Sequence, residues 1–380
     1  MSAPYRIPFN RPHLTGGELD NIRDAVATGK ISGNGKYTQL CQAALAERLG
    51  LGRCLLTSSC TDALEMCALL LDVGPGDEVI LPSYTFVSTA NAFVLRGATL
   101  RFADSYPDNP NVDPASVAAL VTPRTRAIVP VHYAGVACDM DPLLEIAREA
   151  GAAVVEDAAQ AIDSFYKGRP LGSIGALSAF SFHETKNVIS GEGGLLGVND
   201  EALAARAEII WEKGTNRSAF FRGEVDKYGW VDVGSSFLPS EVTAAFLYAQ
   251  IGEIERIQAR RLELWHRYEA RLEPLALAGR FAQPVVPDYA TNNAHMYYLV
   301  MGSIAERSAL IAHLRERGVL AVFHYLSLHK SPFYRDRARG VELPNSDRFT
   351  DRLVRLPLFV DLTDEELDFV CDAICEWADQ

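Results

Sequence analysis

The segment SFHETKNVISGEGGLL, residues 181–196, places Lys186 between an apolar run and a glycine-rich loop. The runs on either side, LSAFSF (177–182) and GLLGV (194–198), are typical of buried strands. A lysine after a strand usually lies on a solvated face. At the carboxyl end of a parallel strand, where open α/β sheets bind ligands, it can instead point into a site. The fold around Lys186 therefore decides its role.

Apolar runs alternate with helical patterns from about residue 50 to residue 200. The candidate strands are CLLT (54–57), EVILP (78–82), TLRFAD (99–104), RAIVPVHY (126–133), AAVVED (152–157), LSAFSF (177–182) and GLLGV (194–198). The amphipathic stretches between them, such as TDALEMCALLLDVG (61–74) and MDPLLEIAREAG (140–151), end at glycines that favour helix termination. Strands separated by helices predict βαβ units, and therefore an α/β fold with a mostly parallel sheet.

The pattern changes near residue 240. The run SEVTAAFLYAQIGEIERIQARRLELWHRYEARLEPLA predicts a long helix. Candidate strands follow at 296–301 and 319–323, with a final helix from about 363 to 378. We expect a large cofactor-binding domain over 1–245, with residues 1–15 near the substrate site, and a small α/β domain over 246–380. The polar, aromatic segment 213–230 predicts a long functional loop.

The composition excludes several classes of protein. The chain has 380 residues, of which 48% are hydrophobic, enough for a large core. The net charge of −13 argues against nucleic-acid and anionic-membrane partners. The seven cysteines are scattered, so neither a disulfide framework nor a metal site is predicted. Because no apolar leader and no run of eighteen apolar residues occurs, we expect a cytoplasmic protein.

Three polar features follow candidate strands. In TSSCTDAL (57–64), hydroxyl residues open a helix, where free N–H groups suit a phosphate, although such residues are more often only caps. In VVEDAAQA (154–161), Asp157 ends a strand and could cap the next helix or pair with a protonated ring nitrogen. The third is Lys186, which in a desolvated site would have a lowered pKa and could act as nucleophile and base.

Together these features match what pyridoxal 5′-phosphate (PLP) needs: a phosphate cradle, a carboxylate for the pyridine nitrogen and a lysine for a Schiff base. The chain order of cradle, aspartate and lysine resembles that of the aspartate aminotransferase fold, fold type I. An aromatic face over the ring is also needed, and SYTFVSTANAF (83–93) offers Tyr84 and Phe86. These residues alone do not choose between the two.

The chain resembles the DegT/DnrJ/EryC1/StrS family of sugar aminotransferases nearly from end to end. The resemblance is carried by LPSYTFVSTANAFVLRGA, VPVHYAGVACDMD, VVEDAAQ, FSFHETKN with EGG, and EKGTNRSAFFRG with DKYGWVDVGSS. Within the family, SFHETKN, KGTNRSAFFRGEVDKY and AVFHYLSLH are most similar to TDP-4-keto-6-deoxyglucose 4-aminotransferases. This likeness implies that L-glutamate aminates TDP-4-keto-6-deoxy-D-glucose, giving TDP-4-amino-4,6-dideoxy-D-galactose and 2-oxoglutarate for surface-glycan biosynthesis.

The resemblance also implies roles for individual residues. Lys186 would carry the cofactor and move the reacting proton, Asp157 would pair with the pyridine nitrogen, and Phe86 occupies the position of the stacking aromatic. The remaining cofactor contacts would be Ser59, Cys60 and Thr61 at the phosphate, Gln160 at the ring oxygen, and Ser181 as a further hydroxyl.

The family further implies a homodimer with its active sites at the interface. Many relatives place an asparagine of the neighbouring subunit at the phosphate. Here VGSSFLPSE (233–241) has none, and Ser235 or Ser236 would substitute. The substrate contacts that we expect are Arg222, Lys227 and Tyr228 for the nucleotide diphosphate, and His183, His324 and His329 near the sugar, although single histidines are more often structural.

Other kinds of protein share parts of this pattern. A 3-keto-sugar aminotransferase, or a 4-aminotransferase forming the other C4 epimer, would keep the fold and cofactor. A non-catalytic ligand-sensing protein on this fold usually carries a DNA-binding segment, and the acidic charge opposes it. A related dehydratase branch has histidine in place of Lys186. A nicotinamide-dependent oxidoreductase would need G-x-G-x-x-G after the first strand, where TSSCTDAL stands.

Overall fold

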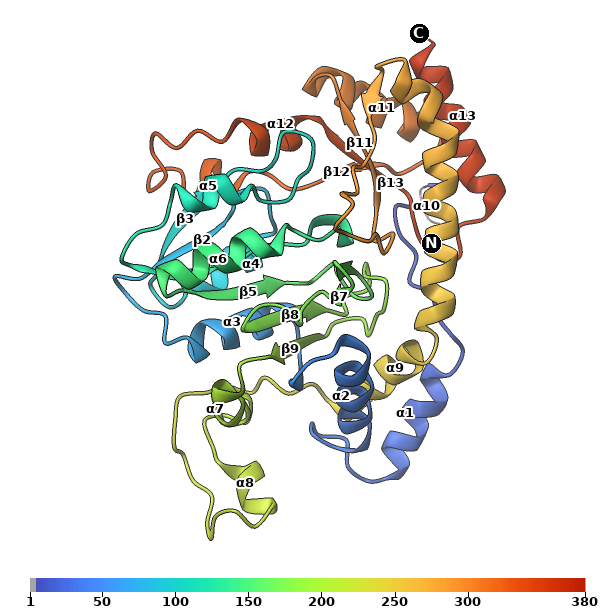
Figure 1. Ribbon diagram of the computed structural model, residues 1–380. Coiled ribbons are helices and arrows are strands. Elements are labelled where there is room, and N and C mark those ends of the chain that lie inside the picture. The colour runs from blue at the N-terminus through green and yellow to red at the C-terminus, as the bar shows by residue number, and fades with distance from the viewer. Residues whose placement is uncertain (1–4, 380) are drawn as a thin grey trace.

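The computed structural model describes residues 5–379, so residues 1–4 of the expected N-terminal segment lie outside the described part. The larger sheet consists of β1 (Arg53–Thr57), β2 (Glu78–Pro82), β3 (Thr99–Ala103), β4 (Thr125–Ile128), β5 (Ala153–Asp157), β8 (Leu177–Ser181) and β9 (Gly194–Val198). Its strand order is β1-β9-β8-β5-β4-β2-β3 (Figure 1). β9 runs opposite to the other six strands, which share one direction; this confirms the predicted α/β fold with a mostly parallel sheet.

Both faces of this sheet are buried. Leu56, Ile80 and Val154 face one side, which is covered by α2 (Lys36–Leu49), α6 (Met140–Ala150) and α9 (Glu241–Ile251). Their chain neighbours Leu55, Leu81 and Val155 face the opposite side, which is covered by α3 (Cys60–Leu70), α4 (Val87–Val94) and α7 (Glu201–Trp211). Successive side chains of a strand point to opposite faces, so two covered faces require continuous apolar runs.

A second sheet consists of β10 (Phe281–Ala282), β11 (Tyr297–Met301), β12 (Val322–Phe323) and β13 (Leu353–Leu356). It is antiparallel, in the order β10-β11-β13-β12. Its core is shared with α10 (Ile254–Leu277), α11 (Ile304–Glu316) and α13 (Asp364–Ala378). Figure 1 shows α10 running beside α13, with α9 at its start. The domain boundary at residue 245 remains a prediction.

Three elements differ from the expected ones. The helix predicted from residue 240 onward is divided at Gly252 and Glu253 into α9 and α10, because glycine favours helix termination. The strand predicted over 126–133 ends as β4 at Ile128, two residues before Pro130, which has no N–H to donate. In the predicted strand 319–323, Val319 pairs with Ile7 instead, which leaves only the last two residues in β12.

The segment predicted as a functional loop, 213–230, contains the short helix α8 (Arg217–Phe221). Figure 1 shows it projecting from the body of the molecule beyond α7. Several apolar side chains here are exposed: Phe221, Tyr228 and Trp230. Over residues 5–379, no helix is long and apolar enough to cross a lipid bilayer.

Candidate active site

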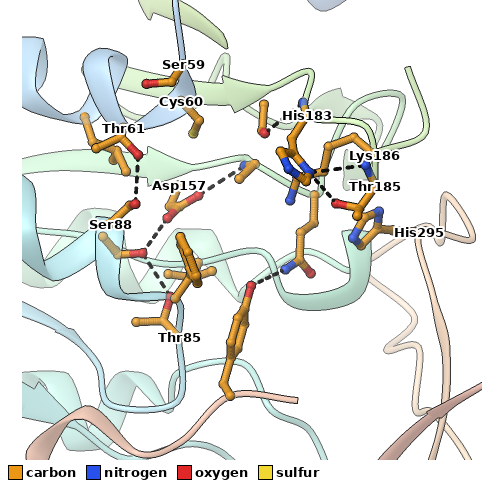
Figure 2. A pocket seen from close by; sticks show the side chains of 18 of the residues that line it. Ser59, Cys60, Thr61, Thr85, Ser88, Asp157, His183, Thr185, Lys186 and His295 are labelled. Atoms are coloured by element: carbon orange, nitrogen blue, oxygen red, sulfur yellow. Dashed lines mark hydrogen bonds between the residues drawn. The ribbon is translucent and has the colours of Figure 1, made fainter. Parts of the chain in front are cut away.

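A cavity of about 590 Å³ opens at the carboxyl ends of the parallel strands, within the size range of small-molecule sites (Figure 2). Its walls come from segments far apart in the chain, because the βαβ connections bring these strand ends to one edge of the sheet. The sequence-predicted residues that line it are Ser59, Cys60, Thr61, Phe86, Asp157, Gln160, Ser181, His183, Lys186 and His324.

Lys186 reaches the cavity from a turn that follows β8. The backbone N–H of Lys186 donates to the carbonyl oxygen of His183 at 2.9 Å. The next residue, Asn187, fixes the turn: its amide donates to Gln258 Oε1 and to the carbonyl of Asn293, both at 2.8 Å. Burial lowers the pKa of the Lys186 amine, although the nearby Cys60 and Asp157 oppose the shift. A lowered pKa leaves more of the amine neutral, as a nucleophile and base requires.

Asp157 is the last residue of β5 and is only 4% exposed. Its carboxylate is held in place by two donors, the Thr89 hydroxyl at 2.7 Å and the Ala159 N–H at 3.1 Å. Burial raises the pKa of Asp157, and these two hydrogen bonds oppose the shift. A buried carboxylate held in this way is suited to pair with a cationic ring nitrogen.

The start of α3 provides an anion site. Ser59 is the N-cap, and its Oγ accepts the Asp62 N–H at 3.0 Å. Cys60 and Thr61 follow in the first turn and line the cavity, and the Thr61 hydroxyl donates to Ser88 Oγ at 2.8 Å. Free N–H groups and hydroxyls at a helix start suit a phosphate. Gly194 passes so close that any Cβ there would overlap the Ser59 and Cys60 backbone.

The structure distinguishes the two candidate aromatic residues. Phe86 lines the cavity and is 54% exposed, so its ring face is free for stacking. Tyr84 is only 1% exposed and lies outside the lining, with its hydroxyl donating to the carbonyl of His324 at 2.6 Å. Gln160 is fixed by the N–H of Ala134 at 2.7 Å and by the hydroxyl of Tyr325 at 3.0 Å.

The PLP group fits these residues. The cavity offers an amine of lowered pKa, an oriented carboxylate, an anion site and an open aromatic face, each suited to a different part of the cofactor. The anion site and Lys186 come from different segments that line the same cavity, as Figure 2 shows.

Other predicted residues do not line the cavity of their own chain. His329 is 3% exposed, with Nδ1 2.7 Å from the Ser83 hydroxyl, so the expectation that it borders the sugar pocket is not met. Arg222 forms ion pairs with Glu208 and Glu224 at 2.9 and 2.7 Å. Also outside the lining are Lys227, Tyr228, Ser235 and Ser236.

Several lining residues escaped the sequence analysis: Thr85, Ser88, Thr89, Glu192, His295, Tyr325 and Arg355. The hydroxyl residues around the start of α4 could have been found from their spacing, because Ser88 and Thr89 follow Thr85 by three and four residues; the hydroxyls of Thr85 and Thr89 lie 3.0 Å apart. The sequence also contains a signal for Arg355, which is the one charged residue of the otherwise apolar strand LVRL. His295 lies outside any predicted helix or strand, and the sequence contains no signal for it.

The fold and this site define a PLP-dependent aminotransferase of fold type I. Residues 12–375 match the DegT/DnrJ/EryC1/StrS aminotransferase family, and the chain belongs to this family. The protein is thus a PLP-dependent sugar aminotransferase, which confirms the predicted family, fold type and cofactor.

Solved structures of similar proteins cover nearly the whole chain. Spr1654 from Streptococcus pneumoniae, known in PLP, PMP and apo forms, is 26% identical, with a TM-score of 0.90 over 98% of this chain and 99% of that one for the PMP form. The aminotransferase TlmJ from Streptoalloteichus hindustanus is 31% identical (TM-score 0.88; 99% and 98% covered). DesV from S. venezuelae is 30% identical (TM-score 0.89; 99% of each chain).

Proposed function

We propose that the protein transfers the amino group of L-glutamate to TDP-4-keto-6-deoxy-D-glucose, forming TDP-4-amino-4,6-dideoxy-D-galactose and 2-oxoglutarate for surface-glycan biosynthesis. The observation that carries the transamination is the convergence of Lys186, Asp157 and the start of α3 on one cavity. The choice of sugar rests on the resemblance in SFHETKN and AVFHYLSLH. His183 and His324, from these two motifs, both line the cavity.

When bound, PLP supplies a carbonyl that takes up the amino group and a ring that withdraws electrons from the reacting carbon. In both halves of the reaction, Lys186 Nζ moves the proton: it takes one from the α-carbon of glutamate and later delivers one to C4 of the sugar. The lowered pKa of Lys186 suits this exchange, because the amine must be free of its third proton to accept one.

Thr89 and Ala159 hold the carboxylate of Asp157, so that its negative charge is directed at the ring nitrogen. Such a charge, fixed before the reaction, stabilises the transition state without reorganisation. Phe86 and the first turn of α3 line the cavity; Phe86 would hold the ring by stacking, and the first turn of α3 would hold the phosphate.

His183 and His324 are proposed to hydrogen-bond the hexose. Burial lowers the pKa of His324 well below its usual value, so this ring stays neutral. Its Nδ1 lies 2.7 Å from the Tyr133 hydroxyl, and its ring stacks on Tyr325 with centroids 3.5 Å apart. The His183 Nδ1 lies 2.9 Å from the Thr185 hydroxyl. The neutral imidazole of His324, oriented in this way, can donate to or accept from sugar hydroxyls.

We further propose a homodimer in which the segment 213–236 of one subunit completes the site of the other. This segment projects from its own subunit (Figure 1) and carries the expected nucleotide-binding residues, which lie outside the cavity of their own chain. Phe221 and Tyr228 are exposed and both contact Phe220, and a contiguous exposed apolar cluster of this kind is typical of a surface that contacts another protein.

Product analysis tests the choice of sugar. The enzyme with PLP and glutamate is supplied with the 4-keto sugar nucleotide, and the product is characterised by NMR. A 4-amino product with the galacto configuration at C4 supports the proposal. A product with the gluco configuration at C4 would contradict the proposed epimer. Turnover of only a 3-keto sugar would contradict the proposed class of substrate.

A further inference from the structure

His295 is a buried histidine that the proposed mechanism does not use. It lies shortly before β11, lines the Lys186 cavity and is only 4% exposed (Figure 2). Its backbone is held from two sides: its N–H donates to Asn293 Oδ1 at 3.0 Å, and its carbonyl oxygen accepts from Arg261 Nη2 at 2.7 Å. The imidazole therefore has a fixed place in the cavity wall.

The hydrogen bonds of Asn187 determine which nitrogen of the His295 ring carries the hydrogen. The Asn187 amide nitrogen donates to Gln258 Oε1 and to the carbonyl oxygen of Asn293, both at 2.8 Å. Since a carbonyl only accepts, the other amide atom, Oδ1, is the one that faces His295 Nδ1, at 2.9 Å. An amide oxygen also only accepts, so Nδ1 must carry the hydrogen. In a neutral ring, Nε2 is then an acceptor.

The surroundings keep this ring neutral. Burial lowers the pKa of His295 well below its usual value, and Lys186, Arg355, Arg261 and His324 act in the same direction, because nearby positive charge disfavours a second ring proton. Among residues 5–379, no group hydrogen-bonds Nε2. The fold thus holds a neutral acceptor in the cavity wall whose lone pair no neighbouring side chain uses.

The donor that suits this acceptor is the Lys186 amine. It lines the same cavity, and among the charges that act on His295, that of Lys186 has the largest effect. The amine has no hydrogen-bond partner among residues 5–379; the groups that act on it by charge are Cys60, Asp157 and Arg355. Because the lysine stem is flexible, the amine can move between the cofactor and the ring once it is released.

We propose that His295 Nε2 accepts a hydrogen bond from the Lys186 amine whenever Lys186 is not attached to the cofactor. This bond limits the rotation of the amine and leaves its lone pair for the reacting proton. His295 is therefore a positioning residue that acts through Lys186 and serves both halves of the reaction. The inference rests on the proposed proton transfer by Lys186 and not on the choice of sugar.

Two substitutions separate the roles of the two ring nitrogens. His295→Asn places an amide nitrogen where Nδ1 lies, so it can keep the bond to Asn187, but it has no acceptor at the position of Nε2. His295→Gln reaches that position with an acceptor oxygen and loses the bond to Asn187. The matched control is His266→Asn, since His266 is exposed and lies outside the cavity lining.

Three measurements follow the tautomer, the amine and the reaction. NMR of the cofactor-free protein with ¹⁵N-labelled histidine identifies the tautomer of His295, whose signals are assigned by their loss in the variants. The pH dependence of the rate at which PLP attaches to Lys186 gives the pKa of the amine. Single-turnover rates with glutamate and, from the amino form of the enzyme, with the keto sugar describe the two half-reactions.

For the wild type we expect the Nδ1–H tautomer at pH 7. In His295→Asn the pKa of Lys186 should fall by about one pH unit, because a hydrogen bond to the charged amine is lost. Both half-reactions should slow by roughly 10-fold, because the amine is less well oriented. His295→Gln should restore the pKa and most of the rate but melt at a lower temperature, since the Asn187 oxygen loses its donor.

An Nε2–H tautomer in the wild type, or an unchanged Lys186 pKa in His295→Asn, would overturn the proposal. A loss confined to one half-reaction would also do so, because His295 would then contact one substrate instead. Normal kinetics in His295→Asn with impaired kinetics in His295→Gln would show a structural role only. If His295→Asn does not fold, the wild-type tautomer still decides. If PLP does not attach to Lys186 at all, the proposed function fails, while the tautomer still tests His295.

Discussion

At the residue scale, the site combines an amine that burial makes less basic with a carboxylate that hydrogen bonds keep in place. Lys186 and Asp157 come from neighbouring strands, β8 and β5, so their approach follows from the parallel pairing of the sheet. Without cofactor, the buried Lys186 ammonium is a cost to the fold, as is common for groups that serve a reaction rather than stability.

Replacing Lys186 by methionine should therefore stabilise the cofactor-free protein while abolishing turnover. The pKa of the Lys186 amine is lowered in the folded state, so folding is penalised at pH values below that lowered pKa. The penalty fades as the pH rises toward 10.5, the ordinary value, where the unfolded chain also loses the proton. Melting temperatures at pH 7 and pH 10 should show a larger gain at pH 7. A methionine variant that melts lower than the wild type at pH 7 contradicts this account.

Replacing Asp157 by alanine should lower kcat by roughly 100- to 1,000-fold, or about 3–4 kcal/mol, because a preorganised charge is lost. The cofactor should still attach through Lys186, so its absorption band is the control within the same sample. Asp141→Ala, which removes an exposed carboxylate paired with Lys167 and Arg169, is the matched variant and should change kcat little. Equal effects of the two substitutions would contradict the role of Asp157.

The sequence could predict Lys186 and Asp157 because each lies at or just after the end of a strand, whereas the choice of Phe86 over Tyr84 came from the family resemblance. His295 left no signal in the sequence, and Arg355 left only a single charge in an apolar strand, which does not by itself show a site residue, because both reach the cavity only through the packing of the second sheet on the first. The sequence also could not show that His329 turns away from the cavity toward Ser83, since neighbouring His324 in the same motif does face it.

At the scale of elements, the geometry of the anion site at the start of α3 depends on the close approach of β9. Gly194→Ala should weaken PLP binding and lower the melting temperature, because a Cβ would overlap the backbone of Ser59 and Cys60. Overpacking of this kind costs about 1–3 kcal/mol. Equilibrium titration with PLP and thermal melting measure the two effects.

The control is Gly74→Ala, where a Cβ would have no atom within 4 Å. If both alanine variants bind PLP as the wild type does, the close passage of β9 has no part in shaping the phosphate site. Strand positions were predictable because apolar runs of the right length begin shortly after glycines. The break between α9 and α10 and the short β4 were not, since they depend on Gly252 and Pro130 within otherwise continuous patterns.

At the scale of the whole molecule, the N-terminal segment connects the two sheets. Ile7 pairs with Val319 beside the second sheet, and the Asn10 amide donates to the carbonyl of Glu184, two residues before Lys186, at 3.1 Å. Residues 5–10 therefore pass close to the turn that carries Lys186. The expectation that residues 1–15 lie near the substrate site remains a prediction, and composition and periodicity alone do not give it, because it depends on contacts between distant parts of the chain.

The proposed dimer leads to a complementation experiment. Two inactive subunits, one with Lys186→Ala and one with residues 217–228 replaced by a glycine–serine linker, are mixed and allowed to exchange. A mixed dimer should contain one complete site, so activity should return to a level no greater than half that of the wild type. If the mixture stays inactive although mixed dimers are detected by mass spectrometry, the segment does not serve the neighbouring site.

The central claim is that Lys186 carries a PLP group that accepts an amino group from glutamate and passes it to the 4-keto sugar nucleotide. The most direct measurement is the absorption spectrum of the PLP-loaded protein, recorded first alone, then with glutamate, and then with TDP-4-keto-6-deoxy-D-glucose after glutamate is removed. The account predicts a violet-region band that glutamate bleaches and the keto sugar restores. A band that glutamate bleaches and this sugar does not restore would contradict the proposed substrate, and the absence of any band would contradict the role of Lys186.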